Sequence, residues 1–354
     1  MEITIQGRKV GPNHPAYFIA DIGANHDGDL KRAIELIRLA KLAGADAAKF
    51  QNFRAPKIVS DYGFKHLGGQ LSHQAKWKKS VFEVYEDASI PFEWTPALKE
   101  ACEEFGIHYY SSPYDYDAID MLDLYVPAYK AGSSLISWPQ AIVRMASLGK
   151  PILIATGDSD ITDVTRAMDM VSNVNNQIVL MQCNTNYTAS ESNYDHLHIS
   201  VLKTYARMWP DVILGLSDHT QSAAPVVGAV ALGACVIERH FTDDNNREGP
   251  DHKFALNPDN WAHMVEEVRI LERALGSEEK FVAENEKETY IVQRHCLRAA
   301  RDVRAGELFT EELIEVLRPA TPGALMAWDI PSVVGKRAAA DIPYGKDLRW
   351  SDLA

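Results

Sequence analysis

The sequence predicts an α/β protein: a (β/α)8 TIM barrel followed by a small β-rich domain. Eight apolar, strand-like runs occur before residue 276 of the 354-residue chain, and each run but the last is followed by a helical pattern. Polar residues gather at the carboxyl ends of these runs, the face on which barrels of this kind carry their functional groups. After a charged stretch, the chain changes to short strands and tight turns.

The barrel elements follow from alternating buried strands and amphipathic helices. The first barrel strand ends at Asp21, Asp29 is expected to cap the next helix, and Gly44 to close it. Thr95 and Thr162 are the expected caps of two later helices. A last helix at 259–276 would complete the ring. The eight strand runs are 16–23, 45–51, 107–113, 127–134, 151–158, 177–184, 212–217 and 234–240.

Three segments are expected along the chain. Residues 1–276 form the barrel, residues 277–291 are a charged linker, and residues 292–354 form the small β-rich domain, with strands at 297–303 and 334–342. Within the barrel, the stretch from residue 52 to 90 is a long insertion after the second strand, and such loops commonly carry substrate contacts.

Composition narrows the class of protein. The net charge of −13 argues against a nucleic-acid partner or an anionic membrane surface, and no uninterrupted apolar stretch is long enough to span a membrane. The four cysteines show no CxxC spacing, so neither a disulfide framework nor a zinc knuckle is indicated, and a reducing cytoplasm fits best.

Two histidines end neighbouring strand runs, His219 in LSDHT and His240 in VIERH. Imidazoles at the same end of adjacent parallel strands can share one divalent cation, with water and substrate in its other positions. A single histidine in such a place more often hydrogen-bonds within its loop. Here the pair is flanked by Asp218, Glu238 and Asp251, which favours a metal site.

Lys49 and Lys130 end two further strands on the same face. Lysines at such positions bind phosphate or carboxylate or form a Schiff base, although a lysine can also simply reach solvent. Short turns rich in glycine, serine and threonine at 131–134, 155–158 and 217–220 suit an oxyanion. Turns of this kind also just end strands, but with two lysines they favour a phosphate pocket.

Four more polar residues end strands or follow them on this face. Asp21 and Asp251 are candidates for proton handling or for binding a substrate hydroxyl, with capping or ion pairing as the structural alternative. Thr156 and Asn184 are included among the expected substrate-binding residues because they end the fifth and sixth strands.

Eight segments together resemble the sialic acid synthase family, which contains N-acetylneuraminate synthases and related nonulosonate synthases. The resemblance covers nearly the whole chain, and the tail is similar to the family's SAF (antifreeze-like) domain. The matching segments are IADIGANHDGD, GADAAKFQ, SSPYD, YKAGSS, KPILIATGD, GLSDHT, LGACVIERHFT and GPDHKF.

The resemblance implies a cytoplasmic transferase that condenses phosphoenolpyruvate with an acylated aminosugar aldehyde and releases phosphate by C–O cleavage. It implies a divalent metal, Mn²⁺ first and Mg²⁺ or Co²⁺ next, held by His219 and His240. It also implies a domain-swapped homodimer in which Arg318 of one subunit enters the partner's active site. The residues matched to the phosphoenolpyruvate pocket are Lys49, Ser112, Lys130, Ser133 and Ser217, and those matched to the sugar are Gln51, Tyr187 and Asp251.

Several positions depart from the family pattern, mainly on the sugar side. Asp21 stands where the family has Glu, and Leu135 where N-acetylneuraminate synthases carry Glu. Ala155 and Asp158 replace the hydroxyl residue and the Met of STGM, and QCNTNY (182–187) replaces HCTxxY. The acceptor therefore stays open between N-acetylmannosamine, a diacetamido-trideoxyhexose and mannose.

Two other functions are weighed against this one. The first is a Kdo- or DAHP-type synthase acting on a phosphorylated aldose, against which the SAF-like tail and the SDHT and ERHF motifs argue. The second is a non-catalytic carbohydrate-binding protein, in which the changes at Leu135 and Ala155 would mark lost chemistry.

Overall fold

The computed structural model describes residues 1–68, 74 and 77–354. The chain divides into two compact units, residues 1–276 and residues 277–354. Among the described residues, no helix has both the length and the apolar character needed to cross a membrane.

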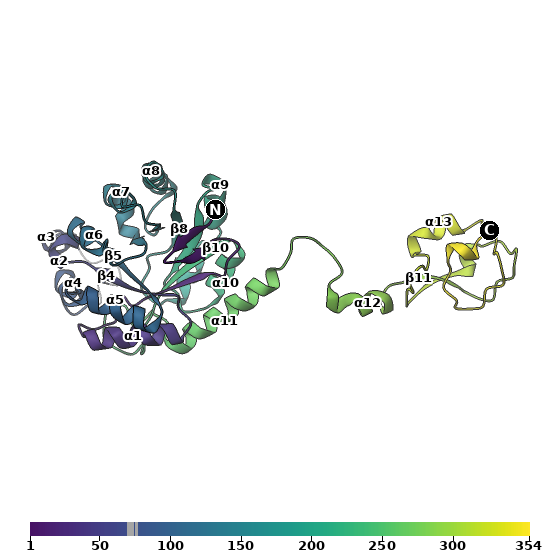
Figure 1. Cartoon of the computed structure of the whole chain (residues 1–354), viewed down its shortest axis with the longest axis horizontal. Coiled ribbons are helices and arrows are strands. Elements are labelled where there is room, and N and C mark those ends of the chain that lie inside the picture. Colours follow the sequence, from purple (N-terminus) through teal and green to yellow (C-terminus); the bar gives the residue numbers. More distant parts are fainter. Residues whose placement is uncertain (69–73, 75–76) are drawn as a thin grey trace. The chain divides into compact units, whose positions relative to one another are not determined.

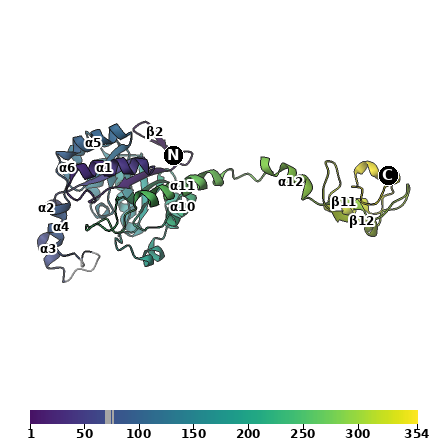
Figure 2. The same cartoon turned by 90° about the horizontal axis from the view of Figure 1, so that it is seen from below.

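The first unit is the predicted barrel, with helices around a ring of strands (Figures 1 and 2). The strand order is β5-β4-β3-β10-β9-β8-β7-β6, all parallel, and β5 contacts β6, so the ring is nearly closed. The strands are β3 (Tyr17–Asp21), β4 (Ala47–Asn52), β5 (His108–Pro113), β6 (Tyr129–Ala131), β7 (Ile152–Ala155), β8 (Ile178–Cys183), β9 (Ile213–Asp218) and β10 (Ala234–His240).

The helices follow the strands in the predicted alternation, and the described residues of the insertion after β4 form three short helices of their own. The helices of the barrel are α1 (Leu30–Leu42), α5 (Trp94–Phe105), α6 (Tyr116–Leu122), α7 (Pro139–Ala146), α8 (Ile161–Ser172), α9 (Val201–Met208), α10 (Ala224–Ala231) and α11 (Pro258–Leu275). Those of the insertion are α2 (Ala55–Ile58), α3 (Asp61–Lys65) and α4 (Val81–Ala88).

The cap of α1 was predicted correctly, because the Asp29 side chain accepts from the N–H groups of Lys31 and Arg32. Two other predicted caps were wrong. Helix α5 already begins at Trp94, so the buried Thr95 lies inside its first turn. Helix α8 is capped by Asp160, whose carboxylate satisfies two N–H groups at the start of the helix and therefore replaces the predicted threonine.

A β-hairpin, β1 (Ile3–Ile5) and β2 (Arg8–Val10), fills the end of the barrel at which the strands begin. Its apolar side chains belong to one buried cluster with residues at or near the starts of the strands. The opposite end, where the strands finish, is therefore the open end. The members of this inner cluster are Ile3, Ile5, Val10, Tyr17, Ile19, Ala47, Tyr110, Ala128, Leu153, Val179, Met181, Ile213, Cys235 and Val236.

A buried histidine in the loop between β3 and α1 makes the fold sensitive to acid. The Nδ1 atom of His26 accepts from the N–H of Gly28 at 3.0 Å, and its ring lies edge-on to Trp94, with centroids 5.7 Å apart. Burial lowers the pKa of His26 from 6.5 to about 4, against the opposing attraction of Asp27. Because the unfolded chain binds this proton more readily, stability is lost as pH falls from 6.5 towards 4.

The free energy of unfolding is therefore expected to fall by about 2 kcal/mol between pH 7.5 and pH 5 through His26 alone. Urea titrations of the wild type and of His26→Asn, followed by tryptophan fluorescence at both pH values, measure this contribution. The variant should be less stable at pH 7.5 but lose about 2 kcal/mol less on acidification. An identical pH dependence in the two proteins would contradict this assignment.

The second unit has its own small core, built around Leu297, Phe309 and Leu348. Its strands β11 (Cys296–Ala299) and β12 (Ile314–Leu317) pair antiparallel. The strand predicted at 334–342 was wrong: Gly335 has φ +86°, which interrupts an extended run, and the segment makes only isolated bridges.

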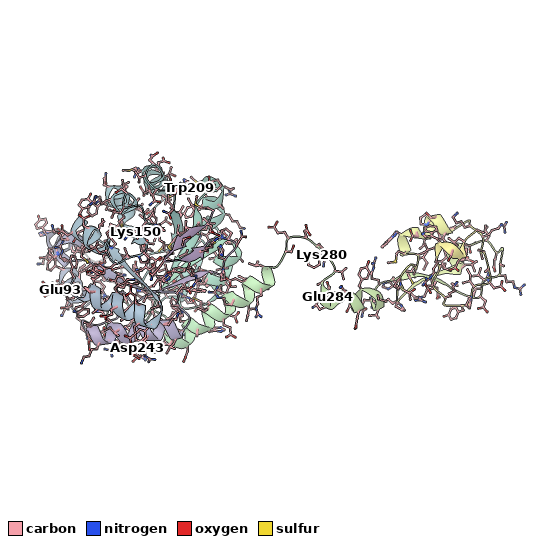
Figure 3. All side chains as sticks on the ribbon, viewed as in Figure 1. Glu93, Lys150, Trp209, Asp243, Lys280 and Glu284 are labelled. Carbon is pink, nitrogen blue, oxygen red and sulfur yellow. The ribbon has the colours of Figure 1, made fainter. Side chains whose placement is uncertain are left out.

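The charged stretch before this core contains helix α12 (Lys287–Val292), and its side chains, such as Lys280 and Glu284 in Figure 3, are exposed.

Candidate active site

The parallel register brings the predicted site residues into one row at the open end of the barrel. His240 on β10 pairs with Asp21 on β3, and Asp21 pairs with Lys49 on β4. Two residues further along β4, Gln51 pairs with Ser112 on β5. Three adjacent strands therefore present an imidazole, a carboxylate and an ammonium group side by side.

A cavity of about 410 Å³ opens at this rim. Most of the predicted site residues line it, and they come from seven of the eight strands and the loops that follow them. The predicted residues in the lining are Asp21, Lys49, Gln51, Ser112, Lys130, Ser133, Tyr187, Ser217, His219, His240 and Asp251.

Thr156 and Asn184 lie instead in a neighbouring hollow. The hydroxyl of Thr156 donates to the Met181 carbonyl at 3.0 Å and accepts from Tyr205 at 2.9 Å, so its role here is to tie strands and helix together. Asn184 contributes through its main chain, because its carbonyl oxygen lies 2.7 Å from Nδ1 of His219.

Arg318, the last predicted residue, belongs to the second unit. In this structure its guanidinium hydrogen-bonds the side-chain oxygen of Gln293.

Strand alternation explains which residues reach the cavity. Every second side chain of a strand points to the same face. Residues an even number of positions from a member of the inner apolar cluster therefore point into the barrel, as Asp21 does two residues after Ile19. Thr156 and Asn184 have the parity of Ile154 and Leu180, which belong to the outer core between strands and helices. Their positions at strand ends were read correctly, but their side chains point to the other face.

Two lysines and two carboxylates form an alternating buried chain at the floor of the cavity. Nζ of Lys49 lies 2.6 Å from Asp21 Oδ2 and 3.8 Å from Glu238 Oε1, and Nζ of Lys130 lies 3.4 Å from the same Glu238 oxygen. Burial alone would lower the pKa of Lys49, but Asp21 and Glu238 together raise it, so the ammonium stays charged. The floor thus keeps two cations ready for an anionic group.

Glu238 is a site residue that the prediction noted only as a neighbour of the histidines. Its Oε1 accepts from Ser217 Oγ at 3.3 Å, while its Oε2 is buried with no hydrogen-bond partner among the described residues. The signal was available, because Glu238 shares parity with Val236 and His240 and must point into the barrel. The same rule applied to β8 would have found Cys183, which also lines the cavity.

The rings of His219 and His240 lie with centroids 5.4 Å apart. Nδ1 of His219 lies 2.7 Å from the Asn184 carbonyl oxygen, and Nδ1 of His240 is buried without a hydrogen-bond partner among the described residues. Burial lowers the pKa of His240 to about 3, against the attraction of Asp251, so this imidazole is neutral. A neutral imidazole with a free nitrogen is the form that binds a metal.

The two imidazoles could supply part of the coordination shell of a cation. No group of three or more His, Cys, Asp or Glu side chains among the described residues is arranged to hold a metal. Any further ligands would have to be water or substrate. Nearby carboxylates add negative charge, with Asp21 Oδ2 3.4 Å and Asp251 Oδ2 3.7 Å from the His240 ring nitrogens.

The surroundings of the two histidines are aromatic. The ring of Tyr187 lies 4.4 Å from that of His219, and Phe254 lies 4.9 Å from His240 and 5.2 Å from Tyr187, measured between centroids. Beside His219, burial opposes ionisation of Cys183, but the interaction with the His219 ring lowers the pKa of the thiol. These contacts fix the orientation of both imidazoles.

Of the residues that depart from the family pattern, some line the cavity and one does not. Leu135 is buried in the apolar core and does not line the cavity. Ala155 and Asp158 both line it, and Asp158 adopts φ +46° at the turn that follows β7.

A hydrogen-bond network centred on His252 connects the loop after β3 with the loop after β10. The buried ring of His252 bonds Asp27 at 2.9 Å and Thr242 at 2.7 Å, which uses both nitrogens. The preceding residue, Asp251, accepts from the N–H of Ala24 at 3.0 Å. The network therefore holds Asp251 at the edge of the cavity.

Replacing His252 with alanine is expected to lower stability by about 3 kcal/mol, because two buried hydrogen bonds are lost. With the two substrates that the resemblance implies, it should also raise KM for the sugar more than KM for phosphoenolpyruvate, since Asp251 loses its support. The control is Glu248→Gln in the same loop, which breaks only an exposed ion pair with Lys78 and should change neither quantity. Steady-state kinetics and urea unfolding measure both, and equal KM changes for both substrates would contradict a positioning role.

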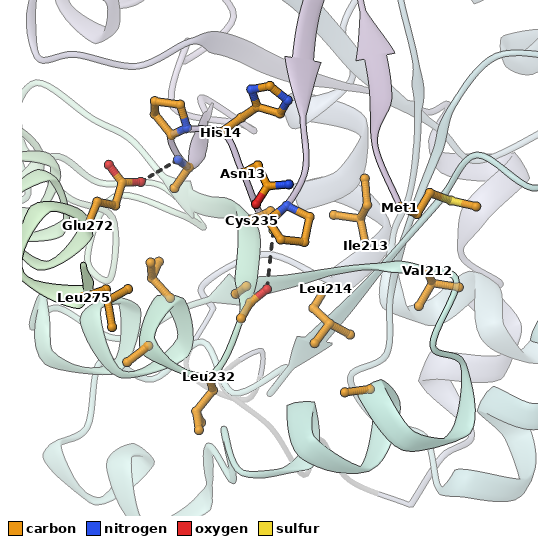
Figure 4. A pocket seen from close by; sticks show the side chains of 18 of the residues that line it. Met1, Asn13, His14, Val212, Ile213, Leu214, Leu232, Cys235, Glu272 and Leu275 are labelled. Carbon is orange, nitrogen blue, oxygen red and sulfur yellow. Dashed lines mark hydrogen bonds between the residues drawn. The ribbon is translucent and has the colours of Figure 1, made fainter. Parts of the chain in front are cut away.

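A larger hollow of about 700 Å³ lies near the starts of β9 and β10 (Figure 4). Val212, Leu214 and Leu232 make its walls largely apolar, and the carboxylate of Glu272 is bonded to the N–H of Ala16 at 2.6 Å. It lacks the convergent polar groups of a catalytic site, which the open end of the barrel supplies.

Known proteins resemble this chain over nearly its whole length. Residues 36–280 match the NeuB family, and residues 294–354 match the SAF domain. The N,N'-diacetyllegionaminic acid synthase of Legionella pneumophila is 32% identical over 97% of this chain and 96% of its own length. The pseudaminic acid synthase of Campylobacter jejuni (strain 81-176) is 32% identical over 95% of this chain and 96% of its own.

A solved structure supports the same assignment. The spore coat polysaccharide biosynthesis protein SpsE of Bacillus subtilis aligns with a TM-score of 0.66 and 31% identity, covering 100% of this chain and 99% of that one. The family match, the full-length relatives and the barrel with its second domain agree. The chain belongs to the NeuB family, an enzyme family of synthases, and ends in a SAF domain.

Proposed function

We propose that the protein is a nonulosonic acid synthase that condenses phosphoenolpyruvate with an N-acylated aminosugar aldehyde and releases phosphate. The observation that carries this proposal is one cavity in which the Lys49 and Lys130 ammonium groups lie beside the His219 and His240 pair. Relatives named for two different nonulosonic acids support the general class of product.

The lysine floor would bind phosphoenolpyruvate. Lys49 and Lys130 supply positive charge for its phosphate and carboxylate, and the hydroxyls of Ser112, Ser133 and Ser217 supply hydrogen bonds. As the C–O bond to phosphate breaks, negative charge grows on the leaving group, and the same ammonium groups stabilise it. Because Glu238 already offsets part of their charge, the floor can also release the phosphate product.

His219 and His240 would hold a divalent cation, Mn²⁺ in our proposal, with Mg²⁺ or Co²⁺ as alternatives. When bound there, such an ion supplies Lewis-acid polarisation of the sugar's aldehyde carbonyl. Asp251 and Gln51 would orient the sugar hydroxyls, and Tyr187 would pack against the sugar beside the imidazoles.

The reaction balances as follows. C3 of phosphoenolpyruvate forms a bond to the aldehyde carbon, whose oxygen takes a proton to become a hydroxyl. The positive charge left at C2 is captured by water, which loses a proton, and the tetrahedral carbon then expels phosphate to become the keto group. Asp21 accepts hydrogen bonds from Lys49 and Gln51 and from the N–H of Gly23, so we assign it to orienting the water.

Isotope labelling tests the proposal directly. Phosphoenolpyruvate carrying ¹⁸O at the bridging oxygen, mixed with Mn²⁺ and a sugar panel, should deliver the label to inorganic phosphate. The panel contains N-acetylmannosamine, a 2,4-diacetamido-2,4,6-trideoxyhexose, mannose and phosphorylated aldoses. Label retained in the sugar acid would contradict C–O cleavage, turnover only with phosphorylated aldoses would favour a Kdo- or DAHP-type synthase, and no phosphate release would favour a carbohydrate-binding protein.

We also propose a domain-swapped homodimer in which Arg318 completes the partner's site. Subunit mixing tests this arrangement without truncating the chain. Arg318→Ala and Lys130→Gln are each expected to be nearly inactive, yet mixed dimers should regain activity, because one intact barrel then receives one intact Arg318. If Arg318 served its own barrel, mixing would restore nothing.

We also propose that the protein works in the cytoplasm. All four cysteines are free and buried, as suits a reducing compartment.

A further inference from the structure

We infer that Asp218 and Arg239 are positioning residues, which hold the two imidazoles of the candidate site side by side for the proposed cation. Each residue directly precedes one of the two histidines: Asp218 ends β9 before His219, and Arg239 precedes His240 in β10. Neither residue lines the cavity. The inference rests on the proposed function in one respect, which is the cation.

The two residues form an ion pair that is buried behind the site. Arg239 and Asp218 lie opposite each other in the register of β10 and β9, and Nε of Arg239 lies 3.3 Å from Asp218 Oδ2. Both side chains are at most 1% exposed. Because side chains alternate along a strand, these two face the helices, while the histidines that follow them face the cavity.

Further hydrogen bonds connect the ion pair to the loop after β9. Nη1 of Arg239 donates to the Ser222 carbonyl at 2.9 Å, and Nη2 donates to the Thr220 hydroxyl at 3.4 Å. Asp218 accepts from the N–H of Thr220 at 3.0 Å and from its hydroxyl at 2.9 Å. His219 lies between Asp218 and Thr220 in the sequence, so these bonds fix the main chain from which its imidazole projects.

The surroundings of the ion pair are apolar. Nη1 of Arg239 lies 3.6 Å from Sδ of Met264 on α11. Leu216 and Ile237, which lie two positions earlier on the same faces of β9 and β10, belong to the apolar core between strands and helices. Burying two charges in such a place opposes folding, and an apolar pair of similar size is often as stable or more stable. Stability alone therefore does not account for the pair.

What the charges add is a fixed register between the two strands. A guanidinium and a carboxylate bond well at only one relative placement, whereas apolar side chains tolerate sliding. A strand rises about 3.3 Å per residue, and the ring centroids of His219 and His240 lie 5.4 Å apart in the present register. A small slip would therefore separate the imidazoles. The ion pair keeps their spacing fixed before a cation binds, as residues behind metal ligands commonly do.

Mn²⁺ binding by a variant without the ion pair tests this inference. Asp218→Asn/Arg239→Met removes both charges, keeps an acceptor for the Thr220 N–H and leaves no unpaired charge in the core. Circular dichroism should show a folded barrel. We expect the Kd for Mn²⁺ to rise by on the order of 10- to 100-fold, with ¹⁴N modulation from fewer than two imidazoles in electron paramagnetic resonance. A wild-type Kd with two coupled imidazoles would overturn the inference.

Arg269→Met is the matched control, because it removes an arginine ion pair elsewhere in the barrel. Arg269 on α11 pairs with Glu272 and donates to the Ala16 carbonyl at 2.9 Å, before the start of β3, and it does not line the cavity. The variant should lose stability in urea but keep the wild-type Kd for Mn²⁺. An equal rise of Kd in both variants would show a general effect of stability and would overturn the inference.

Arg239→Lys decides the question if the variant without the ion pair does not fold. Lysine keeps a positive charge opposite Asp218 but cannot reproduce the planar set of bonds to Asp218, Ser222 and Thr220. Its Kd for Mn²⁺ should rise several-fold, and an unchanged Kd would overturn the inference while the metal site stands. Wild-type protein that binds no Mn²⁺ through imidazoles would overturn the proposed metal site and this inference together.

Discussion

Replacing His240 with alanine is expected to lower turnover by about 1,000-fold or more while leaving the barrel folded. The substitution removes one of two imidazoles whose ring centroids are 5.4 Å apart. The single imidazole of His219 would bind the proposed cation too weakly to retain it. The cavity floor loses no charge, because burial keeps the His240 imidazole neutral. Phosphate release at saturating Mn²⁺ measures the effect, and circular dichroism checks the fold.

The matched control is His263→Ala on α11, where the histidine is exposed and does not line the cavity. This variant should keep the activity of the wild type. Addition of a chelator to the wild type should reproduce the His240→Ala defect, and added Mn²⁺ should reverse it. Turnover by His240→Ala that survives chelation would refute the role of the metal.

Replacing Lys130 with glutamine is expected to reduce kcat/KM for phosphoenolpyruvate by about 100- to 1,000-fold. The ammonium group is buried, and it lies 3.4 Å from Glu238. Without it, the carboxylate of Glu238 is offset only by Lys49 at 3.8 Å, and an anionic substrate meets one cation fewer. The loss should appear in both KM and kcat, because Lys130 acts on the bound substrate and on the departing phosphate.

Lys99→Gln on α5 removes a lysine paired only with Glu103 on the helix surface, and it should change kcat/KM by less than about twofold. Glu238→Gln keeps the size of the side chain but removes its negative charge, and with it the carboxylate that competes with the substrate for Lys130. Activity of Lys130→Gln close to that of Lys99→Gln would show that the floor does not bind phosphoenolpyruvate.

Much of the fold could be predicted because its signals are local. The eight buried runs, the helical spacing between them and the cap at Asp29 are all written in short stretches of sequence. The cap at Thr95 failed because helix α5 begins one residue earlier, at Trp94. The cap at Thr162 failed because the Asp160 carboxylate accepts from the first N–H groups of α8. The second strand of the small domain failed because Gly335 breaks the run.

Part of the candidate site could likewise be predicted from local signals in the sequence, and part of it could not. Strand ends located most of its residues, and alternation along each strand would have separated Thr156 and Asn184 from the cavity and added Glu238. The helices α2 and α3 of the insertion could not be predicted, because they are short and the sequence there has poor periodicity until α4. The role proposed for Arg318 would depend on assembly of two chains, which no pattern within one chain specifies.

Mn²⁺ binding measured by electron paramagnetic resonance tests the central claim most directly, because it needs no substrate. The account predicts one tightly bound Mn²⁺ per chain, with ¹⁴N modulation from two imidazoles in the wild type, from one in His219→Ala or His240→Ala, and none in the double variant. Mn²⁺ that binds the double variant with the affinity and nitrogen coupling of the wild type would contradict it.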